Sequence, residues 1–273
     1  MMQKYLCLYF SGTGNTRFVA RAFSRRMAAT CHSIEEDIDF AGQIAAHDVI
    51  AVCYPIYGSR APLIMRQFVV DNMAAFAGKK LIIFVTQTFF SGDGARSLVD
   101  LFPVNHVEII YAEHFFMPNN VSNIFFLRQA GEKSIVRRAR AAARKMDRVC
   151  HDIRSGKVKR RGFSTLAKLI GKAQGIPWQG SSRHAAASKG TMEHRAKSSV
   201  KIGADCNACG ICVACCPMDN FTSEDSTVTP KNHCTVCYRC INRCPHKAIS
   251  VWFTGRPMWQ YKGVPRRAPH KER

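Results

Sequence analysis

Two copies of one cysteine motif constrain the fold of this chain more strongly than any other feature of the sequence. Residues 206–217 and 234–245 both read C-x2-C-x2-C-x3-C-P, and the second copy follows the first at a displacement of 28 positions. Three thiols at such short steps must lie on one tight loop, which folds around whatever the sulfur atoms bind. The repeated cysteines are Cys206, Cys209, Cys212 and Cys216 in the first copy and Cys234, Cys237, Cys240 and Cys244 in the second.

The spacing of these cysteines indicates iron–sulfur clusters. Neither a signal peptide nor an uncharged apolar run of about 18 residues is present, so we expect a cytoplasmic chain whose thiols bind metal. Structural zinc is the alternative, but zinc sites usually pair two C-x2-C knuckles across a longer gap. Three thiolates from one loop can instead hold three irons of a [4Fe–4S] cubane, and the fourth iron takes a ligand from elsewhere.

Five further cysteines fall outside the repeat. Cys215 has Arg243 as its counterpart and is therefore a spare thiol. The others have no paired spacing, and we expect them to be buried as small apolar side chains without a catalytic role. They are Cys7, Cys31, Cys53 and Cys150.

With the CPHKAIS sequence that ends the second copy, residues 198–254 resemble a bacterial 2[4Fe–4S] ferredoxin. The resemblance implies a small α+β domain with short strands at 199–202 and 248–253. In that family the fourth ligand is exchanged between the two motifs. It therefore implies one cluster on Cys206, Cys209, Cys212 and Cys244, and a second cluster on Cys234, Cys237, Cys240 and Cys216.

A glycine-rich loop opens the chain. The apolar run at 5–10 predicts a buried strand, and the sequence SGTGNT at 11–16 precedes a helical pattern. A strand, a glycine-rich loop and a helix in this order point main-chain N–H groups at an anion. The loop has no lysine for a Walker A motif, and Arg17 stands where a dinucleotide fingerprint needs its third glycine.

The remaining possibility is a loop of three hydroxyls, Ser11, Thr13 and Thr16, which resembles the FMN phosphate loop of flavodoxins. Apolar strands are predicted at 49–53, 81–86 and 107–111, with helices at 62–76 and 93–102 between them. The resemblance implies an α/β, doubly wound parallel sheet of order 2-1-3-4-5, with FMN between the first and third strands. The loop residues implied to bind FMN are Ser11, Gly12, Thr13, Gly14, Asn15 and Thr16.

Two later loops are the implied neighbours of the flavin ring. After the third strand, flavodoxins place an aromatic residue that stacks on the ring, and Tyr57 is preferred over Tyr54 because Gly58 follows it. Ordinary core packing is the alternative for each aromatic residue. The implied residues are Tyr54, Pro55, Ile56, Tyr57 and Gly58 in one loop, and Thr88, Phe89, Ser91 and Gly92 in the loop after the fourth strand.

The positive charge of the chain is concentrated in its middle. Residues 128–201 carry 20 basic and 4 acidic side chains, whereas residues 1–127 carry 10 of each. Residues 132–153 read as one amphipathic helix, with Val136, Ala139, Ala143, Met146, Val149 and Ile153 on its apolar side. Its basic side carries Lys133, Arg137, Arg140, Arg144 and Arg148 and is either a solvated face or a docking strip.

The segment at 155–197 is expected to be a basic connector, and its apolar residues are expected to pack the two domains together. They are Phe163, Leu166, Leu169 and Ile170. Contact with an anionic membrane surface is the alternative. The chain is thus divided into a flavodoxin-like domain at 1–154, a connector at 155–197, a ferredoxin domain at 198–254 and a basic tail at 255–273, expected to be mobile at its end.

Together these regions resemble the flavodoxin–ferredoxin fusion proteins, which implies electron transfer between two [4Fe–4S] clusters, FMN and acidic redox partner proteins. The alternative is a flavin-dependent reductase of a small molecule, for which His106, His114 and Tyr111 are the candidate proton donors. A third class is a redox-gated binding protein that uses the basic strip. No nucleic-acid recognition motif is present, so nucleic acid is not expected as a partner.

Overall fold

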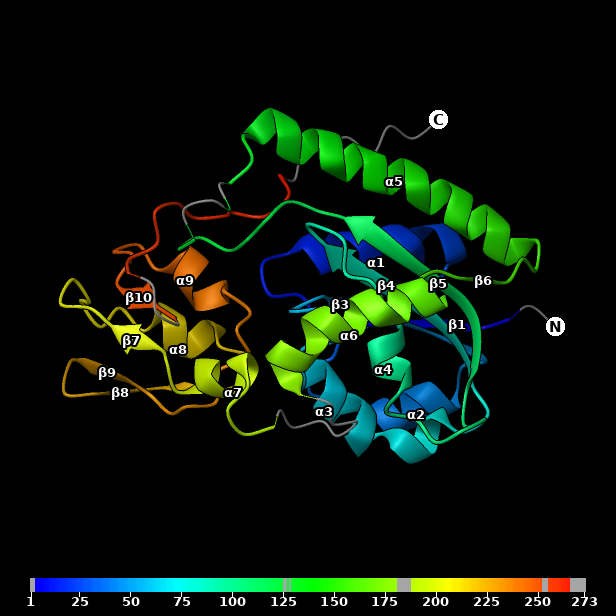
Figure 1. Cartoon of the computed structure of the whole chain (residues 1–273), viewed down its shortest axis with the longest axis horizontal. Helices are drawn as coiled ribbons and strands as arrows, with labels where there is room; N and C mark the ends of the chain where they lie inside the picture. The colour runs from blue at the N-terminus through cyan, green and yellow to red at the C-terminus, as the bar shows by residue number, and fades with distance from the viewer. Residues whose placement is uncertain (1–2, 125–126, 128, 181–187, 252–254, 266–273) are drawn as a thin grey trace.

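A parallel sheet of six strands organises the first two-thirds of the chain (Figure 1). The computed structural model describes residues 3–124, 127, 129–180, 188–251 and 255–265. The strand order is β2-β1-β3-β4-β5-β6, so the predicted order 2-1-3-4-5 is confirmed and one strand is added at its edge. The strands are β1 (Tyr5–Tyr9), β2 (Thr30–Ser33), β3 (Val49–Pro55), β4 (Lys80–Gln87), β5 (Glu108–Phe116) and β6 (Lys159–Arg160).

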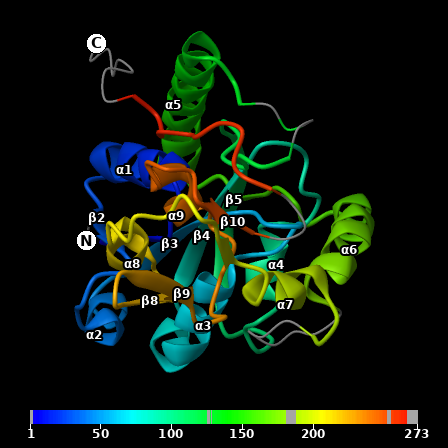
Figure 2. The same ribbon diagram turned by 90° about the vertical axis from the view of Figure 1, so that its left-hand side faces the viewer.

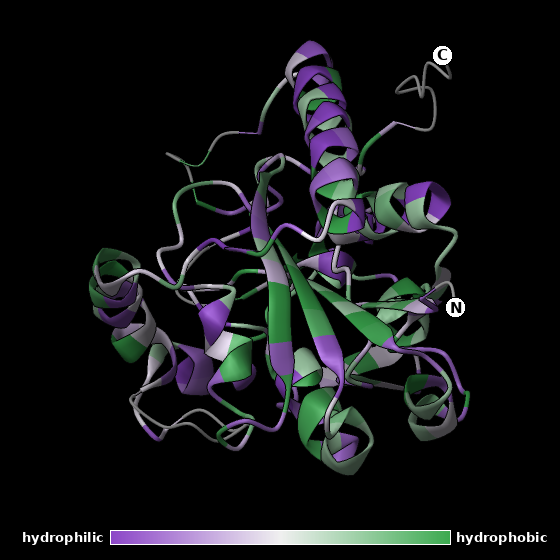
Figure 3. Cartoon of the chain, turned by 90° about the vertical axis from the view of Figure 1, so that its right-hand side faces the viewer, coloured by the Kyte–Doolittle hydropathy of each residue, from purple (hydrophilic) through white to green (hydrophobic). Residues whose placement is uncertain are grey.

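Both faces of the sheet are buried, which explains the continuous apolar runs of its central strands. Because side chains alternate along a strand, Leu6 and Leu8 enter one apolar core while Cys7 and Tyr9 enter the other. In Figure 3 the central strands are mostly hydrophobic, while the helices around them carry both hydrophilic and hydrophobic residues. The strands therefore form a rigid layer whose carboxyl ends meet at one edge.

Helices of different length cover the two faces. The helices α1 (Asn15–Met27) and α5 (Glu132–Arg154) cover one face, and the other is covered by α2 (Phe40–Ala45), α3 (Leu63–Asp71), the 3-10 turn η1 (Met73–Phe76) and α4 (Arg96–Val99). The helix predicted at 93–102 is thus only one turn long. The predicted positions of the others agree with the structure, apart from the division of 62–76 into α3 and η1.

Strand β5 continues five residues beyond its predicted end at Tyr111, through the polar residues Glu113 and His114. The Glu113 carboxylate is fully buried and lies 2.8 Å from the ammonium of Lys159 and 2.9 Å from that of Lys145. Burial by itself would raise the pKa of Glu113, but hydrogen bonds from these lysines outweigh it and lower that pKa to about 2. Ion pairing therefore permits a buried strand where the sequence is polar.

The buried side of α5 is rotated slightly from the predicted one. Ile135, Ala142 and Cys150 are buried, whereas Val136 and Ala143 are only half-buried. Met146 and Val149 lie in the core as predicted, and the arginines of the basic side are exposed. With 3.6 residues per turn, apolar residues at neighbouring positions define two overlapping stripes on this helix, and the structure buries the one next to the stripe that was predicted.

Residues 155–197, expected to connect the domains, contain regular structure that packs on the sheet domain. They form β6, α6 (Thr165–Gln179) and α7 (Met192–Lys197). Helix α6 buries its small residues Ala167, Gly171 and Gly175, while Leu166 and Leu169 are 68% and 62% exposed. The expectation that these two leucines pack the domains together is therefore wrong, because close approach of the helix is possible only on its small-residue side.

The C-terminal region has its own apolar core and is built from short elements (Figure 2). Two antiparallel pairs, β7 (Lys201–Ile202) with β10 (Ile249–Ser250) and β8 (Phe221–Glu224) with β9 (Thr227–Pro230), lie near α8 (Ile211–Cys215) and α9 (Arg239–Arg243). The strands expected at 199–202 and 248–253 are shorter than predicted, and residues 252 and 253 lie outside the described residues. No helix of the described chain is long and apolar enough to cross a membrane.

The described part of the tail contacts both halves of the molecule. The Trp259 indole N–H donates to the carbonyl of Val121 at 3.1 Å, and the Tyr261 hydroxyl donates to Asn15 at 2.6 Å. Gln260 donates to the carbonyl of Cys244. Residues 255–265 thus form an ordered strap, whereas the end of the tail expected to be mobile, 266–273, lies outside the described residues.

Candidate functional site: a cavity beside a cysteine loop

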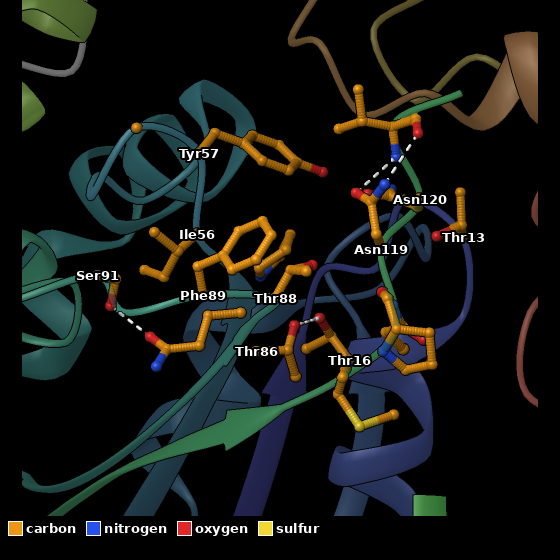
Figure 4. Close-up of a pocket in the computed structure, with 18 of the residues that line it drawn as sticks. Thr13, Thr16, Ile56, Tyr57, Thr86, Thr88, Phe89, Ser91, Asn119 and Asn120 are labelled. Carbon is orange, nitrogen blue, oxygen red and sulfur yellow. Dashed lines mark hydrogen bonds between the residues drawn. The ribbon is translucent and has the colours of Figure 1, made fainter. Parts of the chain in front are cut away.

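A cavity of about 340 Å³ lies at the carboxyl ends of β1, β3, β4 and β5 (Figure 4). This is the size of a small-molecule site, and it lies where the strand order reverses. Twelve of the fifteen residues implied to bind FMN line it: Ser11, Gly12, Thr13, Asn15, Thr16, Pro55, Ile56, Tyr57, Gly58, Thr88, Phe89 and Ser91. The cavity is also lined by residues that the sequence does not predict: Ser59, Thr86, Gln87, Phe90, Leu127, Gln174 and the segment 117–121.

Three of the implied residues, Gly14, Tyr54 and Gly92, do not line the cavity. Tyr54 is fully buried in the sheet core, and its hydroxyl donates to the carbonyls of residues 94 and 95. Gly92 packs against α6, since a β-carbon there would lie 2.6 Å from the amide nitrogen of Gly171. These residues support the walls of the cavity from behind.

The loop after β1 forms one wall. Gly14 has a φ of 101°, a left-handed conformation that suits glycine, and its N–H donates to the Ser11 hydroxyl at 3.1 Å. Helix α1 begins directly after it, with Thr16 paired to Thr86 through their hydroxyls at 2.8 Å. The loop and the N-terminus of α1 thus present hydroxyl groups and main-chain N–H groups to the cavity, and this arrangement favours binding of an anion.

Tyr57 enters the cavity from the loop after β3, as the close-up shows. Its hydroxyl is buried and has no hydrogen-bond partner among the described residues, and burial raises its pKa well above the usual value. The amide nitrogen of Gln87 is likewise buried without a partner in the described chain. Because buried polar groups are normally satisfied, these two atoms are available to a ligand.

The cavity wall contains no acidic, lysine, arginine or histidine side chain among the described residues that form it. Aromatic and aliphatic side chains provide flat apolar surface, while hydroxyls and amides provide neutral donors and acceptors. His106, His114 and Tyr111 do not line it. His106 is bonded to the carbonyl of Met73, and burial lowers the pKa of His114 to about 4.

A second cavity is enclosed by four cysteines from both motif copies. Cys234, Cys237 and Cys240 of the second copy share it with Cys216 of the first, and the rest of its wall is mostly apolar, with Asn220, Thr235 and Tyr238 as its polar residues. Burial raises the pKa of Cys234 to about 11 and that of Cys237 to about 12. Such thiols stay protonated unless a metal displaces the proton, and metal binding here is therefore coupled to proton release.

The backbone around the cysteines follows the 28-residue repeat. Left-handed residues occur at Ala208 and Val236, at Gly210 and Tyr238, and at Asp219 and Lys247. A valine with positive φ is an outlier, which indicates that the backbone shape is imposed by the site. Main-chain N–H groups donate to three cysteine sulfurs. Two of these bonds follow the repeat, from residue 220 to Cys216 and from residue 248 to Cys244, both at 3.3 Å, and a third joins residue 236 to Cys234 at 3.2 Å.

The other four repeated cysteines differ in their exposure. Cys212 and Cys244 are buried, Cys206 is half-buried and Cys209 is exposed. Within the described residues, no three His, Cys, Asp or Glu side chains form a group that could hold one metal ion. In a [4Fe–4S] cluster each iron is bound by a different cysteine. The four thiols of one cluster therefore do not have to converge on a single metal ion. Sulfur donors on tight loops with N–H groups directed at them fit such a cluster.

The remaining cysteines pack against the apolar core, and Cys31, which was expected to be buried, is only half-buried. Cys7 and Cys53 are fully buried under α1, with their sulfurs 3.7 Å apart, and Cys150 is buried on α5. Burial raises the pKa of Cys150 to about 11, and all thirteen cysteines are free. A buried, protonated thiol is a poor nucleophile, so nothing in this cluster resembles a reactive site.

The two cavities are adjacent because the second cysteine loop packs against the loop after β1. A β-carbon on Gly12 would lie 2.5 Å from the carbonyl oxygen of Cys237, so only glycine fits this contact. The Asn120 amide donates to the same carbonyl at 3.4 Å, and Asn242 donates to the Asn120 carbonyl at 2.9 Å. The cysteine loop thus packs against Gly12 and Asn120, two residues that line the first cavity.

No protein-family model matches the sequence, and no curated protein matches it. Solved structures with a similar chain trace include a WrbA-like flavodoxin from Agrobacterium tumefaciens, at 20% identity over 57% of this chain and 99% of that one, with a TM-score of 0.40. Another is Megasphaera elsdenii flavodoxin, at 20% identity over 41% and 85% of the two chains, with a TM-score of 0.35.

A third is a flavoprotein in complex with FMN from Lactobacillus acidophilus NCFM, at 12% identity over 41% and 93% of the two chains, with a TM-score of 0.33. All three TM-scores lie below 0.5, and the function proposed below rests on the residues of this chain instead.

Proposed function

We propose that this chain is an electron-transfer protein that binds FMN in the first cavity and two [4Fe–4S] clusters on its eight repeated cysteines. The observation that carries the proposal is the contact between Gly12 and the Cys237 carbonyl, which joins the anion-binding loop to the second cysteine loop. Electron transfer requires cofactors that lie close together, and this contact leaves no room for solvent between the two loops. FMN exchanges one or two electrons and each cluster exchanges one, so the set can relay single electrons.

The residues of the first cavity have separate roles in this proposal. The hydroxyls of Ser11, Thr13 and Thr16 and the N–H groups of their loop bind the phosphate. The ring of Tyr57 stacks on the flavin, and the amide of Gln87 bonds to its polar edge. Each of these groups lines the cavity, and the last two side chains carry the buried polar atoms that the described chain leaves without a partner.

The cysteines divide into two sets by the cavity that they share. Cys216 closes the set formed by Cys234, Cys237 and Cys240, and by the internal repeat Cys244 closes the set formed by the first copy. The N–H groups that donate to sulfur would stabilise the negative charge of a reduced cluster and raise its reduction potential.

A carrier is favoured over a small-molecule reductase. The reductase needs a proton donor over the flavin. His106, His114 and Tyr111 are all outside the cavity wall, and the Tyr57 hydroxyl, which does line it, holds its proton tightly because burial raises its pKa. Tyr111 is bonded to Asp152, and its burial raises its pKa, so it also holds its proton tightly.

The partner class proposed is an acidic redox protein. Helices α1 and α5 lie side by side, joined by an ion pair of 2.6 Å between Arg26 and Asp147. Their outer surfaces carry exposed arginines, here called the arginine face: Arg17, Arg21 and Arg25 on α1, and Arg137, Arg140, Arg144 and Arg148 on α5. A surface of one sign steers an oppositely charged partner, and the rate of association falls as salt rises.

Anaerobic purification tests the proposal directly. The expected product contains one FMN and about eight irons per chain, with the visible and EPR spectra of [4Fe–4S] clusters. Replacing both Thr13 and Thr16 with alanine should weaken FMN binding and leave the iron content unchanged. Colourless protein, zinc in place of iron and sulfide, or unchanged FMN occupancy in the double variant would each contradict the corresponding assignment.

The partner is tested by electron transfer to an acidic flavodoxin. The rate should fall with increasing salt, and replacing Arg140 and Arg144 with glutamate should slow it at low salt without changing cofactor content. Binding to anionic vesicles with no salt-dependent transfer to the acidic protein would instead assign the arginine face to a membrane surface.

A further inference from the structure

Arg239 joins the second cysteine loop directly to the loop after β1. It lies between two cysteines of the second copy, at the first position of α9, and its side chain is 14% exposed. Its N–H groups donate to the carbonyls of Ser11 at 2.8 Å, Gly12 at 3.0 Å and Cys215 at 3.1 Å. The Glu35 carboxylate accepts two further bonds at 2.5 and 2.7 Å. All five donors of the guanidinium are therefore used.

The two carbonyls on the β1 loop belong to the peptide units whose N–H groups are those of Gly12 and Thr13. In a planar trans peptide the C=O and N–H point in opposite directions. Arg239 lines the groove on the outer side of this loop and does not line the first cavity. The N–H groups of these two peptides are thus directed away from the guanidinium, toward the side of the anion.

A hydrogen bond to a carbonyl from a charged donor polarises the peptide and strengthens its N–H as a donor. We propose that Arg239 is a positioning residue through which the second cysteine loop sets the affinity of the first cavity for FMN phosphate. This inference rests on the proposed function and adds a coupling between the two sites. A folded cysteine loop favours FMN binding, and bound FMN favours the folded loop by the same factor.

The fork shape of the side chain is required, since one guanidinium reaches both carbonyls and Glu35 at once. Lysine has three donors on a single nitrogen and cannot span them. Glu35 compensates the charge of Arg239, so a long-range attraction between Arg239 and phosphate is small. Burial by itself would lower the pKa of Arg239, but the Glu35 carboxylate outweighs this and raises it, which keeps Arg239 charged.

The experiment measures the FMN dissociation constant of the whole iron-loaded chain, stripped of flavin, by fluorescence titration under anaerobic conditions. The variants are Arg239→Gln, Arg239→Lys and the matched control Arg243→Gln. Arg243 lies in the same groove and on the same helix, with no hydrogen bond to the β1 loop among the described residues. Iron content and EPR spectra establish that the cysteine loops are intact in each variant.

We expect Arg239→Gln to weaken FMN binding about 5- to 150-fold, the usual range of coupling between two sites. Arg239→Lys should also bind FMN less tightly than the wild type, and Arg243→Gln should bind it within about twofold of wild type. Equal affinities for Arg239→Gln and Arg243→Gln would overturn the inference. Wild-type affinity in Arg239→Lys would overturn it too, because charge alone would then suffice.

If Arg239→Gln loses iron and unfolds locally, Arg239→Lys carries the test, since it keeps the charge. A wild-type chain that binds no FMN would refute the proposed function itself, and this inference with it. If the wild type and all three variants bind FMN with equal affinity, the inference about Arg239 is refuted but the proposed function is not. As a reciprocal measurement, FMN should change the EPR spectrum of the second cluster in the wild type and change it less in Arg239→Gln.

Discussion

Gly12 packs directly against the second cysteine loop of the C-terminal region, and replacing it with alanine tests how tightly the two regions pack. The added β-carbon would lie 2.5 Å from the Cys237 carbonyl oxygen and 3.1 Å from the Tyr57 hydroxyl. Because contacts below 3.0 Å do not occur for β-carbons in real structures, the loops must separate by at least about 0.5 Å. The obstructing atom is main chain, so no side-chain rotation relieves the clash.

The separation has a calculable effect. The bond from Asn120 to the Cys237 carbonyl is already 3.4 Å long and would be lost. Inserting a methyl group into a packed contact costs about 1–3 kcal/mol. For a chain of this size each kcal/mol lowers the melting temperature by about 2–4 °C, so we expect Gly12→Ala to melt several degrees below the wild type.

Thermal unfolding followed by circular dichroism, under anaerobic conditions, measures this effect. The matched control is Gly203→Ala, where the added β-carbon makes an ordinary contact of 3.4 Å with the Ala248 carbonyl. The control should lie within about 0.5 kcal/mol of wild type. If Gly12→Ala and the control melt at the same temperature, the two loops are not in the close contact on which the proposed function depends.

Further outcomes are expected for three other positions. Cys216→Ala should reduce the iron content by half and remove the EPR signal of the cluster on the second loop, whereas Cys215→Ser should leave iron content unchanged; loss of the other cluster instead would show that each motif ligates locally. Thr16→Val should weaken FMN binding about tenfold in a fluorescence titration, because one charge-assisted hydrogen bond is worth about 1.5 kcal/mol; an unchanged affinity would exclude Thr16 from the phosphate site. Glu113, whose folded pKa is about 2, stabilises the fold above its unfolded pKa of about 4.3, and this stabilisation disappears as the pH falls toward 2. Glu113→Gln should therefore lower the free energy of unfolding at pH 7 by at most about 3 kcal/mol and flatten the pH dependence of that free energy below pH 4.5. Urea titrations at several pH values measure both effects. A variant that keeps the acid sensitivity of the wild type would contradict this.

The sequence predicts those parts of the fold that local pattern determines. The apolar runs of β1, β3 and β4 indicate buried parallel strands, and the glycines after β1 locate the anion loop. Alternation along β3 also separates Tyr54 from Tyr57, because Tyr54 shares its face with Ile50 and Val52 and so enters the core. That period of two was available in the sequence and would have excluded Tyr54 from the cavity.

Other parts depend on contacts between distant segments. The sequence predicts an end of β5 at Tyr111, because no local pattern reveals that the buried carboxylate beyond it is compensated by lysines from α5 and β6. The cavity residues Asn119 and Asn120 follow that strand, so the sequence does not locate them either. In the segment that forms α6, the leucines suggest the packing side, but Ala167, Gly171 and Gly175 recur at every fourth position, which is the signal for close helix packing.

The strap formed by the last described residues has a consequence for how the molecule behaves as a body. Tyr261 is hydrogen-bonded to Asn15 at the start of α1, and Gln260 is hydrogen-bonded to Cys244 at the end of the second cysteine motif. The strap thus connects the C-terminal region to the first helix of the sheet domain. A single backbone cut between the two regions would leave them bound to each other through this closure. The relative position of the two cavities is therefore held by the non-covalent contacts of the strap as well as by the polypeptide that joins the two regions.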